Sequence, residues 1–547
     1  MLLAVVLPVL LFQGWGGQAA AAEAAIASAH PLATAAGEEI LARGGNAFDA
    51  AVAVSAALAV VEPYASGMGG GGFWLIHRAA DGFETMIDGR EVAPRRADRD
   101  MYLDASGSPV PGASLKGPGA AGIPGAPAGL ALLARYGRLP MAATLGPAIR
   151  YADDGFTVNE RYARMARDFG DRLDPRAATI FLDGGRPPAV GFLLRQPQLA
   201  ATLKRVARSG APGFYRGPVA REMLRAVRAG GGIWEARDLT GYRAQEREPV
   251  RVFYGGARIT TAALPSSGGV VLAQALNMLQ LQDLGPVASP EAAHRVIEAL
   301  RRAYRDRACL LGDPGFVQVP VSRLTSLRHA AEQAADMDPA RATPSAALPG
   351  CAAAPAGPST THFSIVDREG NRVAATLSIN TPFGSGFVAG ASGVLLNNEM
   401  DDFSVAPGVP NAYGLVGSEA NAIAPGKRPL SSMTPTFVED GRGVLVLGTP
   451  GGSRIISMVL LAVLDHIHGP APDPLRSVSA PRYHQQYLPD VVETEPEGLG
   501  AQWGGALEAK GHRLKQASRP WGNMQAVYLD KATGQAVAAS DPRGAWY

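Results

Sequence analysis

Hydroxyl-bearing residues around position 360 form the first pattern that could carry chemistry. Residues 360–366 alternate between polar and apolar side chains, and residues 372–380 alternate again after a five-residue turn cluster. This pattern is typical of a β-hairpin. If the turn sets the register, Thr360 lies opposite Ser378, so that two hydroxyl groups meet at one end of the hairpin. A threonine hydroxyl is a weak nucleophile until a neighbouring base activates it.

The pleat sorts the side chains of this hairpin into two faces. One face is apolar and is expected to pack on a core. The polar face carries Thr360, His362, Ser364, Thr376, Ser378 and Asn380. On the pattern alone, a solvated face of an antiparallel sheet is the favoured interpretation, and a functional face that begins with a hydroxyl is the alternative.

A second candidate is the glycine pair Gly451 and Gly452. It follows an apolar strand pattern at residues 444–447 and precedes an apolar helix pattern at residues 455–464. Successive backbone N–H groups at such a helix start could form an oxyanion hole. A plain strand-to-helix turn fits the same pattern equally well.

Charged residues supply two further candidates. Residues 397–403 place three carboxylates, including Glu399 and Asp402, on a short loop. That loop is either a solvated or calcium-like acidic turn or a pocket for an ammonium group. Arg90 has a planar guanidinium that could grip a carboxylate. A structural ion pair is the commoner role for such an arginine.

The residue spacing and net charge argue against metal, phosphate and nucleic-acid binding. The nine histidines form no metal-binding spacing, and two cysteines are too few for a multi-cysteine metal site. The glycine run at residues 66–73 continues as a strand pattern, whereas a phosphate-binding loop opens a helix. The net charge of +2 provides no field for nucleic acid or an anionic membrane. We expect no metal ion, cofactor or nucleic-acid partner.

The elements that must position these residues differ between the two halves of the chain. A hydrophobic fraction of 47% in 547 residues is that of a chain with a large buried core. Helical patterns dominate the first half, including residues 32–42 and an all-apolar helix that begins after Asn46 and runs to about Val61. An Ala, Pro and Gly-rich connector at residues 350–358 then leads into the strand-rich second half.

The N-terminus has the pattern of a secretory signal. An unbroken apolar run at residues 2–12 is followed by small residues at positions 19–22, of the kind that a signal peptidase accepts. Eleven residues are too few to cross a bilayer, for which about 20 are needed. We therefore expect an exported protein without a transmembrane segment.

Taken together, these motifs resemble the γ-glutamyltranspeptidase family, also called glutathione hydrolases. The resemblance runs in order along nearly the whole chain. It rests on residues 44–50 (GGNAFDA), 88–91 (DGRE), 265–269 (PSSGG), 360–364 (TTHFS), 395–403 (LLNNEMDDF), 428–433 (RPLSSM) and 450–454 (PGGSR).

The resemblance implies an α+β protein, a four-layer αββα sandwich of the N-terminal-nucleophile hydrolase type. Such proteins are made as one chain that cuts itself, here between Ser359 and Thr360. The expected parts are a signal peptide at residues 1–24, a large subunit at residues 25–359 and a small catalytic subunit at residues 360–547. Cleavage gives Thr360 a free α-amine that can act as the base for its own hydroxyl.

The resemblance also implies a role for each site residue. Thr360 is the nucleophile, and Ser378 stands where the family usually has a supporting threonine. The γ-glutamyl group of glutathione or a related compound is transferred to water or to an amino acid or dipeptide acceptor. The implied residues are Gly451 and Gly452 for the oxyanion, Arg90, Ser431 and Ser432 for the substrate's α-carboxylate, Asn380, Glu399 and Asp402 for its α-ammonium, and Tyr413 in a lid.

Two alternative functions remain open. Cephalosporin or glutaryl acylases share the fold and cleave side chains that lack the α-amine, and the pairing of Arg90 with two acids argues against them. A non-catalytic exported binding protein is the other alternative, and it would need no hydroxyl at position 360. The resemblance favours an enzyme that is periplasmic or secreted in a bacterium.

Overall fold

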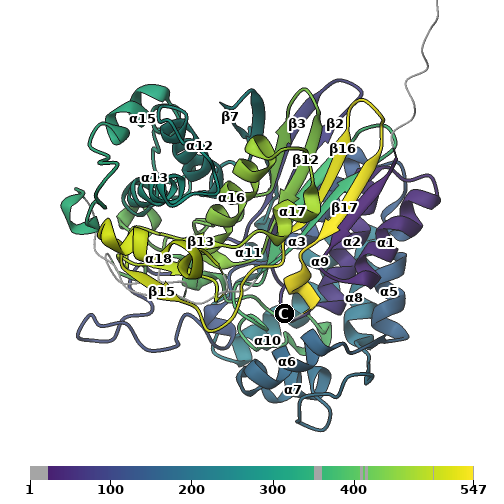
Figure 1. Ribbon diagram of the computed structural model, residues 1–547. Coiled ribbons are helices and arrows are strands. Elements are labelled where there is room, and N and C mark those ends of the chain that lie inside the picture. Colours follow the sequence, from purple (N-terminus) through teal and green to yellow (C-terminus); the bar gives the residue numbers. More distant parts are fainter. Residues whose placement is uncertain are drawn as a thin grey trace, which may run out of the picture.

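Two six-stranded antiparallel sheets lie face to face at the centre of the molecule (Figure 1). The computed structural model describes residues 23–349, 360–406, 411–412, 415, 417–496 and 498–545. The first sheet has the order β1 (Ala25–Ser28), β9 (Thr361–Val366), β10 (Arg372–Ser378), β2 (Gly71–Arg78), β3 (Phe83–Gly89), β6 (Gln245–Arg247). The second has the order β17 (Ala536–Ser540), β16 (Gln525–Asp530), β12 (Gly443–Gly448), β11 (Thr436–Glu439), β8 (Ala257–Thr261), β7 (Val250–Tyr254).

Helices cover the outer face of each sheet. Those on the first sheet's side are α1 (Pro31–Ala42), α2 (Ala47–Val61), α3 (Ala126–Leu133), α5 (Gly146–Asp153) and α8 (Pro197–Ser209). Those on the second sheet's side are α12 (Gly268–Leu279), α13 (Pro290–Leu310) and α16 (Ile455–His468). Figure 1 shows the purple helices α1 and α2 and the teal helices α12 and α13 on opposite sides of the strands. The expected four-layer αββα sandwich is therefore confirmed.

The remaining helices and strands surround this sandwich. The helices are α4 (Met141–Thr144), α6 (Glu160–Phe169), α7 (Pro175–Phe181), α9 (Pro212–Tyr215), α10 (Gly217–Ala229), α11 (Ala236–Gly241), α14 (Val321–Leu324), α15 (Leu327–Ala334), α17 (Pro474–Ser479) and α18 (Leu499–Ala509). The strands are β4 (Phe156–Thr157) and β5 (Leu193–Leu194), which pair with each other, and β13 (Tyr483–His484), β14 (Val492–Thr494) and β15 (Leu514–Gln516).

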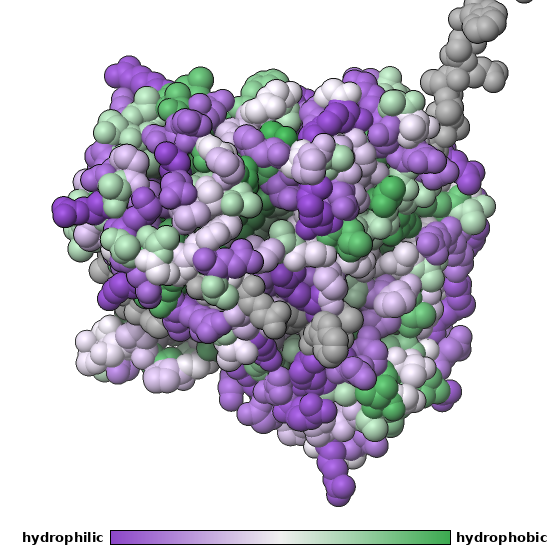
Figure 2. All heavy atoms as spheres, viewed as in Figure 1, coloured by the Kyte–Doolittle hydropathy of each residue, from purple (hydrophilic) through white to green (hydrophobic). Residues whose placement is uncertain are grey.

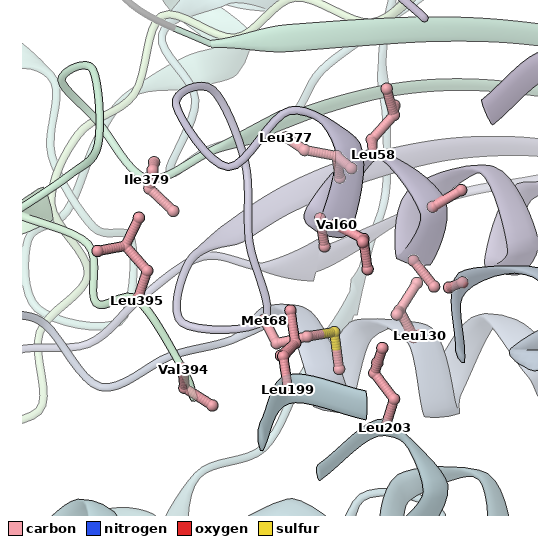
Figure 3. Packing of buried hydrophobic residues seen from close by; sticks show 14 of the residues in the cluster. Leu58, Val60, Met68, Leu130, Leu199, Leu203, Leu377, Ile379, Val394 and Leu395 are labelled. Carbon is pink, nitrogen blue, oxygen red and sulfur yellow. The ribbon is translucent and has the colours of Figure 1, made fainter. Parts of the chain in front are cut away.

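Helix α2 begins and packs as its sequence predicts. The Asn46 side chain accepts hydrogen bonds from the N–H groups of Phe48 and Asp49, and the Asp49 carboxylate accepts one from the N–H of Asn46. This capping box satisfies N–H groups that would otherwise lack a partner at the helix start. Every residue of α2 is buried, because other helices and the first sheet surround it. Figure 3 shows Leu58 of this helix beside Leu377 of β10.

The β9–β10 hairpin has the predicted register but not the solvated face. Arg372 pairs with Val366 and Leu377 with Thr361, so Thr360 and Ser378 come next in line. The polar face is buried because the second sheet covers it. The Ser364 hydroxyl donates to the carbonyl of Gln525 in β16 over 3.1 Å. A Cβ atom on Gly448 of β12 would come within 2.3 Å of the His362 ring. The solvated interpretation of this face is therefore wrong.

Several sequence predictions lie outside the described residues: most of the signal segment, the connector at residues 350–358, the cleavage residue Ser359, and Tyr413. Within the described part of the chain, no helix combines the length and the apolar character needed to cross a membrane. Figure 2 shows hydrophilic and hydrophobic residues interspersed over the face in view.

Candidate functional site

Thr360 lies at the end of the hairpin, directly before β9, with 6% of its surface exposed. Its Oγ1 accepts a hydrogen bond from the backbone N–H of Gly451 over 3.1 Å. Gly451 and Gly452 precede α16 through one 3₁₀ turn, so their N–H groups lie at the positive end of a helix. The glycine pair therefore does more than turn the chain, since it brings an N–H donor to the candidate nucleophile.

The backbone at Gly451 excludes a side chain. Its φ angle is +148°, and a Cβ atom there would lie 2.5 Å from Cε of Met458 in α16. A left-handed backbone of this kind favours glycine. Glycine therefore suits position 451 for two reasons: the φ angle is positive, and there is no room for a Cβ atom.

Ser378 and Asn380 end the second strand of the hairpin. The Ser378 hydroxyl accepts a hydrogen bond from the N–H of Asn380 over 2.7 Å. Asn380 has a φ angle of +73°, which is uncommon for a residue other than glycine. Its side-chain amide donates to the carbonyl of Asn398 over 2.9 Å, which ties the hairpin to the acidic loop. Strained backbone held in this way is typical of functional sites.

The acidic loop is a buried part of an ion-pair network. Arg90 follows β3 and is 1% exposed. Its Nη1 contacts Oε1 of Glu399, and its Nη2 contacts Oδ2 of Asp402. Its Nε donates to the carbonyl of Pro429 over 3.2 Å. A solvated or calcium-like turn does not describe this loop. The resemblance implies that Arg90 and the acids hold opposite ends of a ligand, whereas here they contact each other directly.

Burial sets the charge state of this cluster. It raises the pKa of Glu399 to about 7, and Asp402 adds to the rise while Arg90 opposes it. Burial also raises the pKa of Asp402. Glu91, adjacent to Arg90, has its pKa raised well above the usual value by burial and by Glu399. Burial works to lower the pKa of Arg90, but the acids raise it above the ordinary value. The arginine is therefore charged, and its acidic neighbours compete for it.

The serine pair brings in a residue that sequence reasoning missed. The Ser432 hydroxyl accepts a hydrogen bond from Nη2 of Arg307 over 3.2 Å. Ser431 is fixed by its backbone, whose carbonyl accepts from the N–H and hydroxyl of Ser267 at 2.8 and 2.6 Å. Burial lowers the pKa of Arg307 to about 10. One feature of the sequence could have identified Arg307: it lies three residues after Tyr304, on the same buried side of α13.

Most of the predicted site residues converge on one pocket. The free space in it is about 20 Å³, little more than a water molecule needs. Gly451 adjoins Thr360, and Ser359 and Tyr413 lie outside the described residues. The pocket is lined by Arg90, Arg307, Thr360, Ser378, Asn380, Glu399, Asp402, Leu415, Leu430, Ser431, Ser432, Met433, Gly452 and Ile455.

Comparison with known proteins places this arrangement in a family. A sequence model described as "Gamma-glutamyltranspeptidase" matches residues 33–546, which include every described residue of the pocket. The chain belongs to the γ-glutamyltranspeptidase family. The resemblance carried by the sequence motifs is thereby confirmed.

Relatives within and around the γ-glutamyltranspeptidase family match along most of their length. The "Glutathione hydrolase proenzyme" of Escherichia coli is 44% identical over 528 residues, covering 95% of this chain and 90% of that protein. The "Acylase ACY 1 proenzyme" of a Pseudomonas species is 38% identical, covering 91% and 88%. A solved cephalosporin acylase from Bacillus halodurans has a TM-score of 0.82 at 27% identity, covering 96% of this chain and 95% of that one.

Proposed function

We propose that this protein is a γ-glutamyltransferase and glutathione hydrolase made as a self-cleaving precursor. One observation carries the proposal: the hydroxyl of Thr360, with an N–H donor at 3.1 Å, shares a pocket with Arg90, Glu399 and Asp402. A nucleophile beside a cation and two carboxylates matches a substrate whose reacting amide is attached to a free amino acid end.

Processing is the first step of this proposal. The chain cuts itself between Ser359 and Thr360, which divides it into a large subunit at residues 25–359 and a small subunit at residues 360–547. Each cut releases one α-amine, on Thr360. That amine is the base for the Thr360 hydroxyl, because an α-amino group has an ordinary pKa of about 7.7 to 8.0.

Catalysis then proceeds by acyl transfer. The Thr360 oxygen attacks the γ-carbonyl carbon of the substrate, and its proton passes to the α-amine. The N–H groups of Gly451 and Gly452 stabilise the oxyanion, an interaction worth about 3 kcal/mol for each donor. The C–N bond breaks as the leaving amine takes the proton, and a γ-glutamyl ester of Thr360 remains. Water, or the amine of an amino acid or dipeptide, attacks the ester carbonyl and regenerates the hydroxyl.

Substrate recognition follows from exchanging ion pairs. The α-carboxylate of a γ-glutamyl group replaces Glu399 and Asp402 on Arg90, with Ser431 and Ser432 as further donors. Its α-ammonium then neutralises the two displaced acids, and Asn380 accepts a hydrogen bond from it. No buried charge loses its partner in this exchange, which keeps the cost of substrate binding low. A ligand without the amine leaves both acids unpaired.

The cellular place of the reaction is part of the proposal. The apolar run at residues 2–12 and the small residues that follow support a signal peptide at residues 1–24 and export to the periplasm or the medium. Glutathione and other γ-glutamyl compounds are then met outside the cytoplasm.

An acylase acting on glutaryl or cephalosporin side chains is the second candidate, and the likeness to the B. halodurans structure favours it. The deciding experiment is denaturing electrophoresis of the purified protein followed by assays with γ-glutamyl and glutaryl p-nitroanilides. We expect two fragments and much faster release of the anilide from the γ-glutamyl compound. Faster turnover of the glutaryl compound would establish the acylase instead. A single uncleaved band and no turnover of either compound would contradict both enzyme functions and favour a non-catalytic binding protein.

A further inference from the structure

Arg307, near the end of α13, is a buried cation without a direct counterion. It is 4% exposed and lines the pocket that also contains Arg90. Among the described residues it forms no ion pair, and its hydrogen-bond partners are the hydroxyl groups of Ser267 and Ser432. Two carboxylates, by contrast, contact Arg90 directly. Burial lowers the pKa of Arg307, whereas at Arg90 the acids outweigh burial and raise the pKa.

The hydrogen bonds of Arg307 fix the direction in which two hydroxyl groups donate. A guanidinium can only donate, so each hydroxyl must accept from it. Nε donates to Oγ of Ser267 over 2.9 Å, and that hydroxyl donates to the carbonyl of Ser431 over 2.6 Å. Nη2 donates to Oγ of Ser432 over 3.2 Å. Among the described residues, the Ser432 hydroxyl has no acceptor for its own hydrogen. That hydrogen is therefore available to a ligand in the pocket.

Arg90 and Arg307 hold the two ends of one short segment, residues 429–432. Nε of Arg90 donates to the carbonyl of Pro429 over 3.2 Å, whereas Arg307 reaches the hydroxyl of Ser432. Both arginines and this serine line the same pocket. An anion bound beside Ser432 therefore lies in the field of two guanidinium groups, of which only Arg307 lacks an acid of its own.

An α-carboxylate is the part of the proposed substrate that fits this arrangement. An ionised carboxylate only accepts hydrogen bonds, so it can take the free hydrogen of the Ser432 hydroxyl. A hydroxyl that itself accepts from a cation is a stronger donor. The carboxylate also supplies the negative charge that the buried Arg307 lacks. A neutral carboxamide in the same place accepts the hydrogen bond but supplies no charge.

We propose that Arg307 is a positioning residue for the substrate's α-carboxylate. It holds the Ser432 hydroxyl so that its hydrogen points to the carboxylate, and its charge makes the site select an ionised carboxylate over a neutral amide. This inference rests on the proposed function, and it adds to Arg90 a second determinant of the same end of the substrate.

The test compares two substrates that differ only in the charge of the α-carboxyl group: γ-glutamyl p-nitroanilide and the same compound with an α-carboxamide. Arg307→Met removes the charge and the N–H donors, but leaves no contacting carboxylate without a partner. We expect the KM of the acid to rise about 30-fold, the effect of losing one charge-assisted contact. The KM of the amide and both kcat values should change by less than about threefold, because Arg307 does not contact Thr360.

Two further variants separate the charge from the hydrogen bonds. Arg307→Lys keeps the charge but lacks the fork that reaches both serines. It should keep the preference for the acid and raise the KM of the acid only about fivefold. In a Ser432→Ala background, Arg307→Met should raise the KM by less than it does in the parent enzyme, because the two residues act on the same contact.

The matched control is Arg295→Met, which removes an arginine from the first half of the same helix and outside the pocket lining. It should leave both KM values unchanged. An equal rise in KM for acid and amide in Arg307→Met would overturn the inference in favour of a structural role. An undiminished effect in the Ser432→Ala background would overturn the link to that hydroxyl.

Electrophoresis first establishes that each variant is processed. If Arg307→Met stays uncut, Arg307→Gln takes its place, since it keeps an N–H donor for the hydroxyl groups without the charge, and the same selective loss for the acid is expected. Absence of γ-glutamyl p-nitroanilide turnover by the unchanged enzyme would be a failure of the proposed function instead. The dissociation constants of glutamate and its α-amide, measured by calorimetry, then test Arg307 by the same ratio.

Discussion

Arg90 and Glu399 are in direct contact through Nη1 and Oε1, although both side chains are only 1% exposed. The pair is not isolated, since Asp402 contacts the other nitrogen of the guanidinium and Glu91 lies 3.7 Å away. Three carboxyl groups thus share one cation inside the protein. Such an arrangement contributes little net stability, but removing the cation leaves several acids without a counterion.

Replacing Arg90 is therefore expected to affect both stability and binding. Arg90→Gln lowers the free energy of unfolding by about 3 to 5 kcal/mol, because the buried acids lose their partner. Arg90→Lys keeps the charge and loses less stability, but raises the KM of a γ-glutamyl substrate about 100-fold, since lysine lacks the planar fork. Denaturant unfolding and steady-state kinetics measure the two effects.

The control for this pair of variants is Arg78→Gln, which breaks an exposed ion pair with Asp81. Surface pairs contribute little, so this variant is expected to unfold like the parent protein. Equal stability of Arg90→Gln and Arg78→Gln would show that the buried cluster does not depend on its cation.

The raised pKa of Glu399, about 7, predicts a pH dependence of substrate binding. Below pH 7 the carboxyl is protonated and cannot pair with the substrate's ammonium. The KM of γ-glutamyl p-nitroanilide should therefore fall as the pH rises through about 7.

The variant Glu399→Gln separates this titration from that of the Thr360 amine. Glutamine does not titrate, so the fall in KM across neutral pH should disappear while kcat still rises with the pH. Steady-state kinetics between pH 5.5 and 8.5 provide the measurement. A variant whose KM retained the original pH dependence would assign the step to another group.

Thr360→Ala is expected to remain a single chain and to lose activity by at least about 10³-fold, because both processing and catalysis need its hydroxyl. Thr360→Ser is the matched variant, since it keeps the hydroxyl and should still divide into two fragments. Electrophoresis measures chain cleavage, and the anilide assay measures activity. Cleavage of Thr360→Ala at the same bond would mean that another group cuts the chain.

Local patterns in the sequence predicted the hairpin register and helix α2 correctly. The hairpin register and helix α2 follow from residue alternation, a turn cluster and one asparagine cap, all of which act over short distances. The polar face of the hairpin was predicted to be solvated, and this was wrong. Its burial depends on β12 and β16, which lie more than sixty residues further along the chain. Arg307 was missed for the same reason, since only packing of α13 brings it to Ser432.

Gly451 provides the sharpest test of the proposed oxyanion site. Gly451→Ala must place a methyl group 2.5 Å from Met458 with the backbone at a φ angle of +148°. The chain then shifts at the N–H that contacts Thr360, and kcat should fall by about 10²- to 10³-fold, the usual effect of losing one oxyanion donor. The KM should change little, because Gly451 does not line the pocket that contains Arg90 and Glu399. Gly441→Ala is the control, as no atom lies within 4 Å of its added methyl group. A Gly451→Ala enzyme with normal kcat would show that this N–H does not act in the transition state.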